Sequence, residues 1–254
     1  MLLIYHWSHE EMKPELEEYS LYLISNLTHQ AINPLNGVIG TLDNLVKGTV
    51  PENRRDQRLN SARSQLEYTV MLIRNLAYFA QYASDKTGVE PIKNPTDKTC
   101  IIPQVLIESA QFFQEQASND GIGIEVEGRH IQNAVYGDPS LLRQVFMNIF
   151  DNAVKYGHKD SIVSVKNWIQ KKTNDLIVTV EGESTPFEND DEIFAIGVRG
   201  KSAQEKTSSG SGLGLHICKL IVEKVFSGKI SAHHSSAGIA TFEIRIPGAF
   251  IKQG

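Results

Sequence analysis

The sequence has little cysteine, and what it has matches no recognised framework. Its 254 residues include two cysteines, Cys100 and Cys218, which lie far apart. They fit neither a metal-ligand spacing nor a disulfide pattern. We therefore expect two free, buried thiols in a reducing compartment.

Long apolar runs and a secretory leader are also missing. No stretch approaches the roughly eighteen consecutive apolar residues that cross a bilayer, so we expect no membrane span in this chain. The opening residues MLLIYHWSHEE have no basic region and no small-residue cleavage site, so we expect them not to be a secretory signal peptide.

An excess of basic residues is absent as well. The chain has 25 Lys and Arg against 30 Asp and Glu, a formal net charge of -5. The basic residues form no stripe that could follow the phosphates of a duplex. Nucleic acid is therefore not an expected partner.

The length and composition indicate two globular domains. With 254 residues, of which 41% are hydrophobic, the chain is longer than one core usually needs. A polar stretch at 84–98 with one glycine and two prolines predicts the boundary. We expect a first domain at residues 1–86 and a second at 95–254.

The first domain is predicted to be a helical hairpin. Between Glu11 and Lys47, and again between Leu59 and Ala80, apolar residues recur at spacings of three and four. Gly48 and Pro51 separate the two series, as a helix stop and restart would. Because a lone hairpin has nothing against which to bury its apolar stripes, we expect a homodimer with a four-helix bundle.

The second domain mixes both element types and is predicted to be an α+β sandwich with one helical layer. Its strands are of antiparallel type. Helical patterns occupy 104–117, 139–156 and 213–226, and strand patterns occupy 122–128, 161–169, 176–182, 229–234 and 239–246.

Three segments have the residue types that phosphoryl chemistry needs. The first contains His29, whose imidazole can act as a nucleophile near neutral pH, and Pro34, which bends the helix that follows. A solvated histidine beside a chance proline is the alternative. The second contains Asn148 and Asn152, which share a helix face and can hold hydrated Mg²⁺. A polar helix face in contact with water is the alternative there.

The third segment is glycine-rich and runs directly into an apolar helix. In GSGLGL at 210–215, the glycines let the backbone approach phosphate oxygens, and the helix that follows presents free N–H groups. No strand precedes it, so a Rossmann dinucleotide site is excluded. His216 follows, and we expect it to pack or cap more readily than to touch phosphate.

In this order, the three segments resemble the sensor histidine kinases of two-component signalling. The resemblance runs from Glu17 to Pro247 and covers a phosphoacceptor hairpin and the Bergerat-type ATP-binding domain shared with gyrase-, Hsp90- and MutL-type ATPases. NIFDNAVKY at 148–156 is similar to the N-box, and the stretch from Glu192 to Gly200 to the F-box that opens the ATP lid.

The resemblance implies a role for each matching residue. His29 is implied as phosphoacceptor, with Asn33 in the same catalytic box. Asn148 and Asn152 are implied as the Mg²⁺ and phosphate ligands. The remaining residues implied at the ATP site are Lys155, Tyr156, Glu183, Gly210, Gly212, Leu213 and Gly214.

Two positions depart from the family pattern. The family has an acidic residue directly after the phosphoacceptor. This chain has Gln30 at that position, which cannot accept the imidazole proton. The first glycine box, Asp-x-Gly-x-Gly, reads Gly182-Glu183-Ser184-Thr185-Pro186, so the aspartate that reads adenine is missing. Glu183 is the carboxylate nearest in sequence, and strand alternation points it to the opposite face from Gly182.

The resemblance implies a cytoplasmic kinase that uses ATP and Mg²⁺ to phosphorylate His29 and passes the phosphoryl group to a response-regulator aspartate. The two departures predict weak activity. A catalytically weak or inactive pseudokinase that acts as a dimeric scaffold is the alternative from another class of function. A stand-alone ATPase of the gyrase type is disfavoured because such enzymes lack the histidine box.

Overall fold

The computed structural model of the chain describes residues 12–83, 97–187, 192–198 and 212–252. The chain divides into two compact units, Met1–Leu76 and Ala77–Gly254. The boundary expected between residues 86 and 95 lies outside the described residues.

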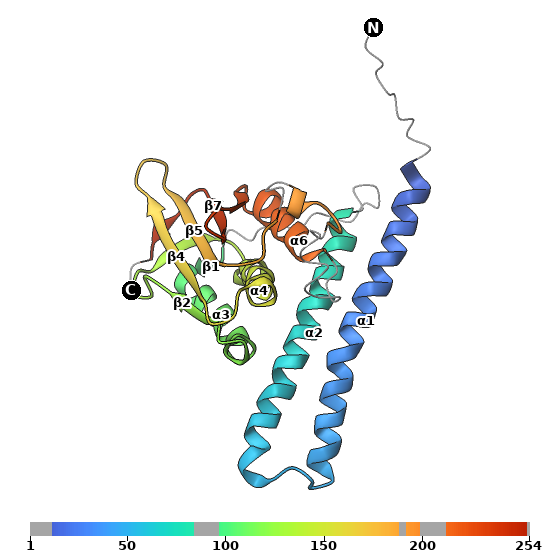
Figure 1. The fold of residues 1–254 in the computed structure, drawn as a ribbon. Coiled ribbons are helices and arrows are strands. Elements are labelled where there is room, and N and C mark those ends of the chain that lie inside the picture. The colour runs from blue at the N-terminus through green and yellow to red at the C-terminus, as the bar shows by residue number, and fades with distance from the viewer. Residues whose placement is uncertain (1–11, 84–96, 188–191, 199–211, 253–254) are drawn as a thin grey trace. The chain divides into compact units, whose positions relative to one another are not determined.

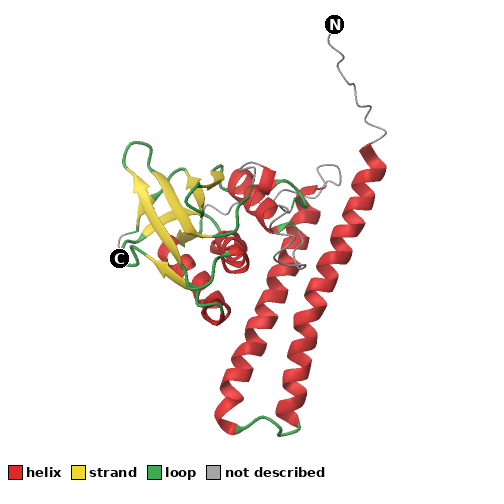
Figure 2. Ribbon diagram, in the orientation of Figure 1, coloured by secondary structure: helices red, strands yellow, loops and turns green. Residues whose placement is uncertain are grey.

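The two predicted helices are α1 (Met12–Val46), which lies in the first unit, and α2 (Arg55–Ala83), whose residues from Ala77 onward belong to the second unit. A turn and the short helix η1 (Glu52–Arg54) join them (Figure 2). Gly48 ends α1 with a positive φ of 67°, and the Thr49 N–H donates to the carbonyl of Asn44 at 3.1 Å. A left-handed glycine at this position is a common helix stop.

The hairpin buries some of its apolar residues and exposes others. Val38 on α1 and Ala62 and Leu72 on α2 are buried. Gly37 faces Gln65 so closely that a Cβ would collide with the Gln65 side chain. A second set, at helical spacing, remains exposed in the single chain: Ile32, Ile39, Leu42, Val46, Leu59, Leu66, Val70 and Ile73.

The second unit is built on a five-stranded sheet in the order β2-β4-β5-β7-β6 (Figure 1). The strands are β2 (Gly123–Val126), β4 (Ile162–Gln170), β5 (Asp175–Glu183), β6 (Lys229–His234) and β7 (Ile239–Ile246). Three of the four pairings are antiparallel, as predicted. The pairing of β2 with β4 is parallel, because a helix crosses over between these two strands in the chain.

One helical layer accompanies this sheet, so the predicted α+β sandwich is confirmed. Its helices are α3 (Ile102–Asn119), α4 (Pro139–Tyr156) and α6 (Gly214–Leu220). α6 continues directly into a π-helical turn, η3 (Ile221–Val225). The alternating burial of β7 matches a sheet with one covered face.

Three short strands form a second sheet that the sequence did not predict. β1 (Thr99–Ile101), β3 (Asn133–Tyr136) and β8 (Phe250–Ile251) pair in the order β1-β3-β8. Strands of two to four residues are too short to show a period of two. The first three residues of β3 are all buried, which removes the alternation altogether.

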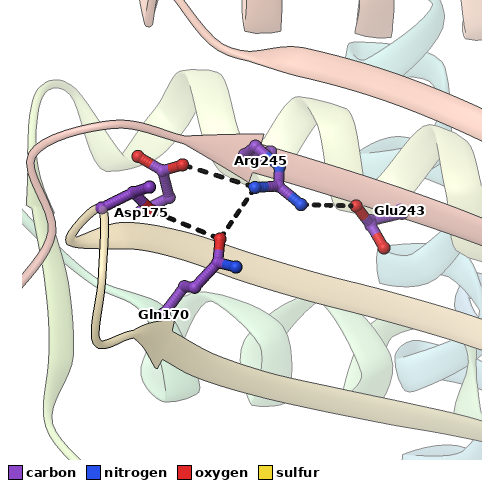
Figure 3. A network of polar contacts seen from close by, with 5 residues as sticks. Gln170, Asp175, Glu243 and Arg245 are labelled. Atoms are coloured by element: carbon purple, nitrogen blue, oxygen red, sulfur yellow. Dashed lines mark hydrogen bonds and ion pairs between the residues drawn. The ribbon is translucent and has the colours of Figure 1, made fainter.

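A polar network ties the β4–β5 turn to β7 (Figure 3). Arg245 donates to Gln170 Oε1 at 2.8 Å and lies 3.5 Å from Asp175 Oδ2. Its other terminal nitrogen lies 3.4 Å from Glu243 Oε1. One guanidinium therefore links the ends of β4 and β5 to β7.

None of the helices within the described ranges is both long enough and apolar enough to cross a membrane.

Candidate functional site

Helix α4 forms the centre of the candidate site and is fixed at both ends. Asp138 caps its start, where Oδ1 accepts from the Ser140 N–H at 2.9 Å and Oδ2 binds Lys98 Nζ at 2.9 Å. At the other end, the Tyr156 carbonyl accepts from the Thr185 N–H at 3.0 Å. These contacts set the position of the helix and therefore of the side chains along it.

The Asp138 cap carries a full negative charge at neutral pH. Burial opposes ionisation of Asp138, but hydrogen bonds from Lys98 and Ser140 outweigh it and lower the pKa of the carboxyl below its ordinary value. A carboxylate at a helix N-terminus also interacts favourably with the helix dipole.

Asn148 and Asn152 project from the same face of α4. Asn148 is 3% exposed, and Asn152 Nδ2 donates to the Asn148 carbonyl at 2.9 Å. This bond orients the Asn152 amide along the helix. In the described ranges, no group of three His, Cys, Asp or Glu side chains could hold a metal ion. Amide oxygens such as those of Asn148 and Asn152 are among the ligands that hard cations accept.

Lys155 lies one turn after Asp151 and pairs with it. Lys155 Nζ lies 2.6 Å from Asp151 Oδ2. Burial raises the pKa of Asp151 above its ordinary value, although the Lys155 ammonium acts in the opposite direction. Asp151 was not singled out from the sequence, yet its spacing of four from Lys155 was a visible signal.

The glycine-rich segment meets α4 at Asn148. Gly214 begins α6, and a Cβ at this position would lie 3.3 Å from Asn148 Oδ1. Leu213 is fully buried beside it. The structure thus brings two separately predicted parts of the site together. Gly210 lies outside the described residues.

Gly197 and Gly212 flank the segment that the family resemblance identifies as the ATP lid. The Gly197 N–H donates to the Gly212 carbonyl at 3.0 Å. Gly212 has a φ of 67°, and a Cβ on it would lie 2.7 Å from the Gly197 backbone. Both the conformation and the close approach therefore require glycine at 212.

His216 packs as the sequence suggested. Its Nδ1 lies 2.9 Å from the Phe194 carbonyl in η2 (Glu192–Phe194). Burial, together with the nearby charge of Lys219, lowers the pKa of His216 despite the bond to Phe194. A neutral ring that donates from Nδ1 matches this contact. His216 therefore ties η2 to α6.

Glu183 lies on the opposite side of β5 from Gly182. Its Oε2 is 3.8 Å from His158 Nδ1, and both side chains are largely exposed. β5 pairs with β7 without interruption through Glu183. A bulge that would bring Glu183 to the Gly182 side is therefore not present, and the structure does not bring this carboxylate to the aspartate position.

An aromatic cluster forms around Phe187, which lies in the segment after Gly182. The Phe187 ring lies 5.4 Å from the His234 ring and 6.3 Å from the Phe242 ring. His234 Nε2 lies 3.2 Å from the Ser184 carbonyl. No local sequence pattern predicts this cluster, because its members come from three separate segments.

The proposed phosphoacceptor lies in the first unit. His29 and Asn33 are both exposed on α1, one helical turn apart. Pro34 lies inside the same helix, where it removes one backbone N–H from the helical pattern. Gln30 is half-buried.

A family model matches the second unit. Residues 137–249 match the family described as histidine kinase-, DNA gyrase B-, and HSP90-like ATPases. The match begins next to the Asp138 cap and ends after β7, so it contains α4, the described glycines and most of the sheet.

Relatives extend the similarity across both units. The sensor protein KdpD of Clostridium acetobutylicum is 28% identical over 242 residues, which cover 94% of this chain and 26% of KdpD. The Acinetobacter baumannii histidine kinase AdeS is similar in fold, with a TM-score of 0.55 and 18% identity over 86% of this chain and 97% of that one.

A solved structure of histidine kinase ThkA in complex with response regulator protein TrrA also has this fold. Its TM-score is 0.53 at 16% identity, covering 97% of this chain and 67% of that one. The chain spans about a quarter of the length of the curated relative KdpD.

Proposed function

Since residues 137–249 match the family of histidine kinase-, DNA gyrase B-, and HSP90-like ATPases, we propose that the chain is the kinase core of a sensor histidine kinase. In this proposal it transfers the γ-phosphoryl group of ATP to His29. The similarity to KdpD, which covers both units, supports joining the ATP site and the histidine in one function.

The observation that carries the proposal is the contact between Asn148 and Gly214. Two segments more than sixty residues apart meet here, and a Cβ on Gly214 would lie only 3.3 Å from Asn148 Oδ1. The result is a polar helix face beside backbone N–H groups at the start of α6. Phosphates bind well at such helix starts.

The described residues fit ATP and Mg²⁺ at this face. The oxygens of Asn148 and Asn152 would hold Mg²⁺, which supplies positive charge against the triphosphate when bound. Lys155 would bind a phosphate, and Gly212, Leu213 and Gly214 would offer backbone to the triphosphate. Tyr156, half-buried at the end of α4, would line the nucleotide.

His29 would accept the phosphoryl group. An imidazole nitrogen forms the new bond to the γ-phosphorus while the bond between that phosphorus and the bridging oxygen of ADP breaks. The displaced imidazole proton has to leave, and Gln30 cannot accept it. We therefore propose a slow autophosphorylation in which water takes the proton. Asn33, one turn away, would orient the phosphoryl group.

We further propose that the chain acts as a homodimer. The eight exposed apolar residues of α1 and α2 repeat at spacings of three, four and seven, as in helices that pack against a partner bundle. A second copy of the hairpin would bury both stripes and complete a four-helix bundle.

The proposed partner is a response-regulator receiver domain in the cytoplasm. His29 is exposed on α1, so a partner can reach it. The structural relative ThkA was solved in complex with the response regulator protein TrrA. In this chain, the phosphoryl group would pass from His29 to an aspartate of such a protein.

The decisive experiment is incubation with Mg²⁺ and ATP labelled on the γ-phosphate. A phosphohistidine is labile in acid and stable in base, so the label should be lost only in acid. His29→Ala should not label, whereas His130→Ala, which replaces another exposed histidine, should label normally. A wild-type chain that binds ATP yet never acquires label would favour the scaffold over the kinase.

A further inference from the structure

Asp151 and Lys155 form an ion pair that differs from an ordinary helix-surface pair. Their side chains are 14% and 17% exposed, and Asp151 Oδ2 lies 2.6 Å from Lys155 Nζ. A solvated pair at this spacing contributes little, because water screens both charges. Screening is weaker here, so the position of the Lys155 ammonium depends more strongly on the Asp151 carboxylate.

The second oxygen of Asp151 is the unusual feature. Within the described residues, Asp151 Oδ1 is buried and has no hydrogen-bond partner. A buried acceptor without a donor lowers stability, and such groups in folded proteins often serve a function. An apolar residue at 151 would avoid the cost, so stability alone does not explain the carboxylate.

Asp151 lies on the functional face of α4. Residues 148, 151, 152 and 155 follow the spacing of three and four that places side chains side by side on a helix. Asn148 meets Gly214, and Asn152 donates to the Asn148 backbone. The ammonium that Asp151 holds is therefore on the same face as the two asparagines.

We propose that Asp151 is a positioning residue that holds the Lys155 ammonium on the nucleotide-binding face of α4, so that Lys155 binds the phosphates of ATP from a fixed place. The inference rests on the proposed function of this face. Lysine has a flexible four-carbon stem and three N–H donors. An ammonium with three donors can bind a carboxylate and a phosphate at the same time.

The same contacts indicate that Lys155 stays on Asp151 when a nucleotide binds. If Lys155 left, Asp151 Oδ2 would lose its contact with the ammonium. Among the described residues Oδ1 has no donor either, so neither oxygen of this nearly buried carboxylate would then have a partner. Separating a buried pair costs far more than separating an exposed one. Asp151 is therefore a support for Lys155 and not a competitor of the phosphate.

The experiment is a double-mutant cycle read by calorimetric titration with ATP in Mg²⁺. Asp151→Asn and Lys155→Met should each weaken ATP binding about tenfold, and the double variant should be no weaker than either one. Asp151→Glu, which keeps the charge, should recover part of the affinity. Asp43→Asn, which changes an exposed carboxylate four residues before Lys47, should leave binding unchanged.

Each other outcome overturns the inference. Tighter ATP binding by Asp151→Asn would show that the carboxylate competes with phosphate. Additive losses in the double variant, or a changed melting temperature with unchanged ATP affinity, would show a purely structural role. If the wild-type chain binds no ATP, the proposed function fails as well. If the wild type binds ATP and Asp151→Asn matches it, only the positioning role fails.

Discussion

The Gly197 N–H donates to the Gly212 carbonyl at 3.0 Å, and this bond brings two points of the chain fifteen residues apart into direct contact. η2 ends shortly before Gly197, and α6 begins shortly after Gly212. The contact therefore sets where α6 starts and, through Gly214, how α6 meets Asn148.

Gly212→Ala should disturb this contact. A Cβ at 212 would lie 2.7 Å from the Gly197 backbone, and the residue would keep a strained φ of 67°. We expect a lower melting temperature and weaker ATP binding. Gly238→Ala is the matched control, because its φ is 84° with nothing within 4 Å. This variant should lose only about 1 kcal/mol of the free energy of unfolding, which is the cost of the left-handed conformation. Equal losses in the two variants would contradict the importance of the contact.

Gln30→Glu should accelerate autophosphorylation of His29. It places a carboxylate beside the imidazole, and general bases contribute roughly 10²- to 10⁴-fold to such reactions. The measurement is the initial rate of acid-labile labelling from γ-labelled ATP. Asn36→Asp adds the same charge farther along α1, at an exposed position, and should leave the rate unchanged. An unchanged rate in Gln30→Glu would show that proton removal does not limit the reaction.

Leu66→Gln combined with Ile73→Gln should convert the proposed homodimer into monomers. These side chains are 43% and 55% exposed in the single chain, and burying them against a second copy is the proposed driving force for association. Light scattering at micromolar concentration gives the mass. Ile131→Gln replaces an equally exposed isoleucine in the other unit and should remain dimeric. A monomeric wild type would refute the bundle.

ATP should bind weakly and with little preference over GTP. A hydrogen bond to a charged group contributes roughly 1.5–3 kcal/mol. The missing aspartate should therefore lower the affinity for ATP by about one to two orders of magnitude. Low-micromolar ATP binding with strong discrimination against GTP would contradict this prediction.

Gly182→Asp tests the same point by restoring the carboxylate. A Cβ at 182 would lie 3.3 Å from Val163 Cγ2, so the variant should be combined with Val163→Ala to make room. We expect the double variant to bind ATP about tenfold more tightly and to bind GTP with unchanged affinity. Val163→Ala alone is the control for the altered packing.

Both thiols should be unreactive in the folded chain. Burial raises the pKa of Cys100 and Cys218 to about 12, from an ordinary 9.0. At pH 8 each is then about a thousandfold less ionised than a free thiol. A thiol reagent should modify neither residue until guanidinium unfolds the chain, and both thereafter. Above pH 9 only the unfolded state loses these protons, so stability should fall as the pH rises from about 9 toward 12.

The long elements were predictable because their patterns are strong. The predicted ranges 139–156, 229–234 and 239–246 agree with α4, β6 and β7. The strands β1, β3 and β8 were missed because they hold two to four residues each. Their stability comes from pairing between distant segments, which a local pattern does not reveal.

The candidate site was predictable in its motifs but not in its contacts. The asparagines and glycines were identified from residue type and spacing, and the structure added that Asn148 meets Gly214. Asp151 was missed, because a carboxylate four residues before a lysine usually marks a solvated helix face. Burial of that pair depends on the packing around α4, which spacing does not specify.

The fixing of α4 at both ends has a consequence for hydrogen exchange. Helices usually lose their first and last turns in local opening, and the exposed amides there exchange quickly. In α4, the Asp138 cap holds the first turn and the Tyr156–Thr185 bond holds the last. Its amide protons should then exchange together, at the rate of unfolding of the whole second unit, from one end of the helix to the other.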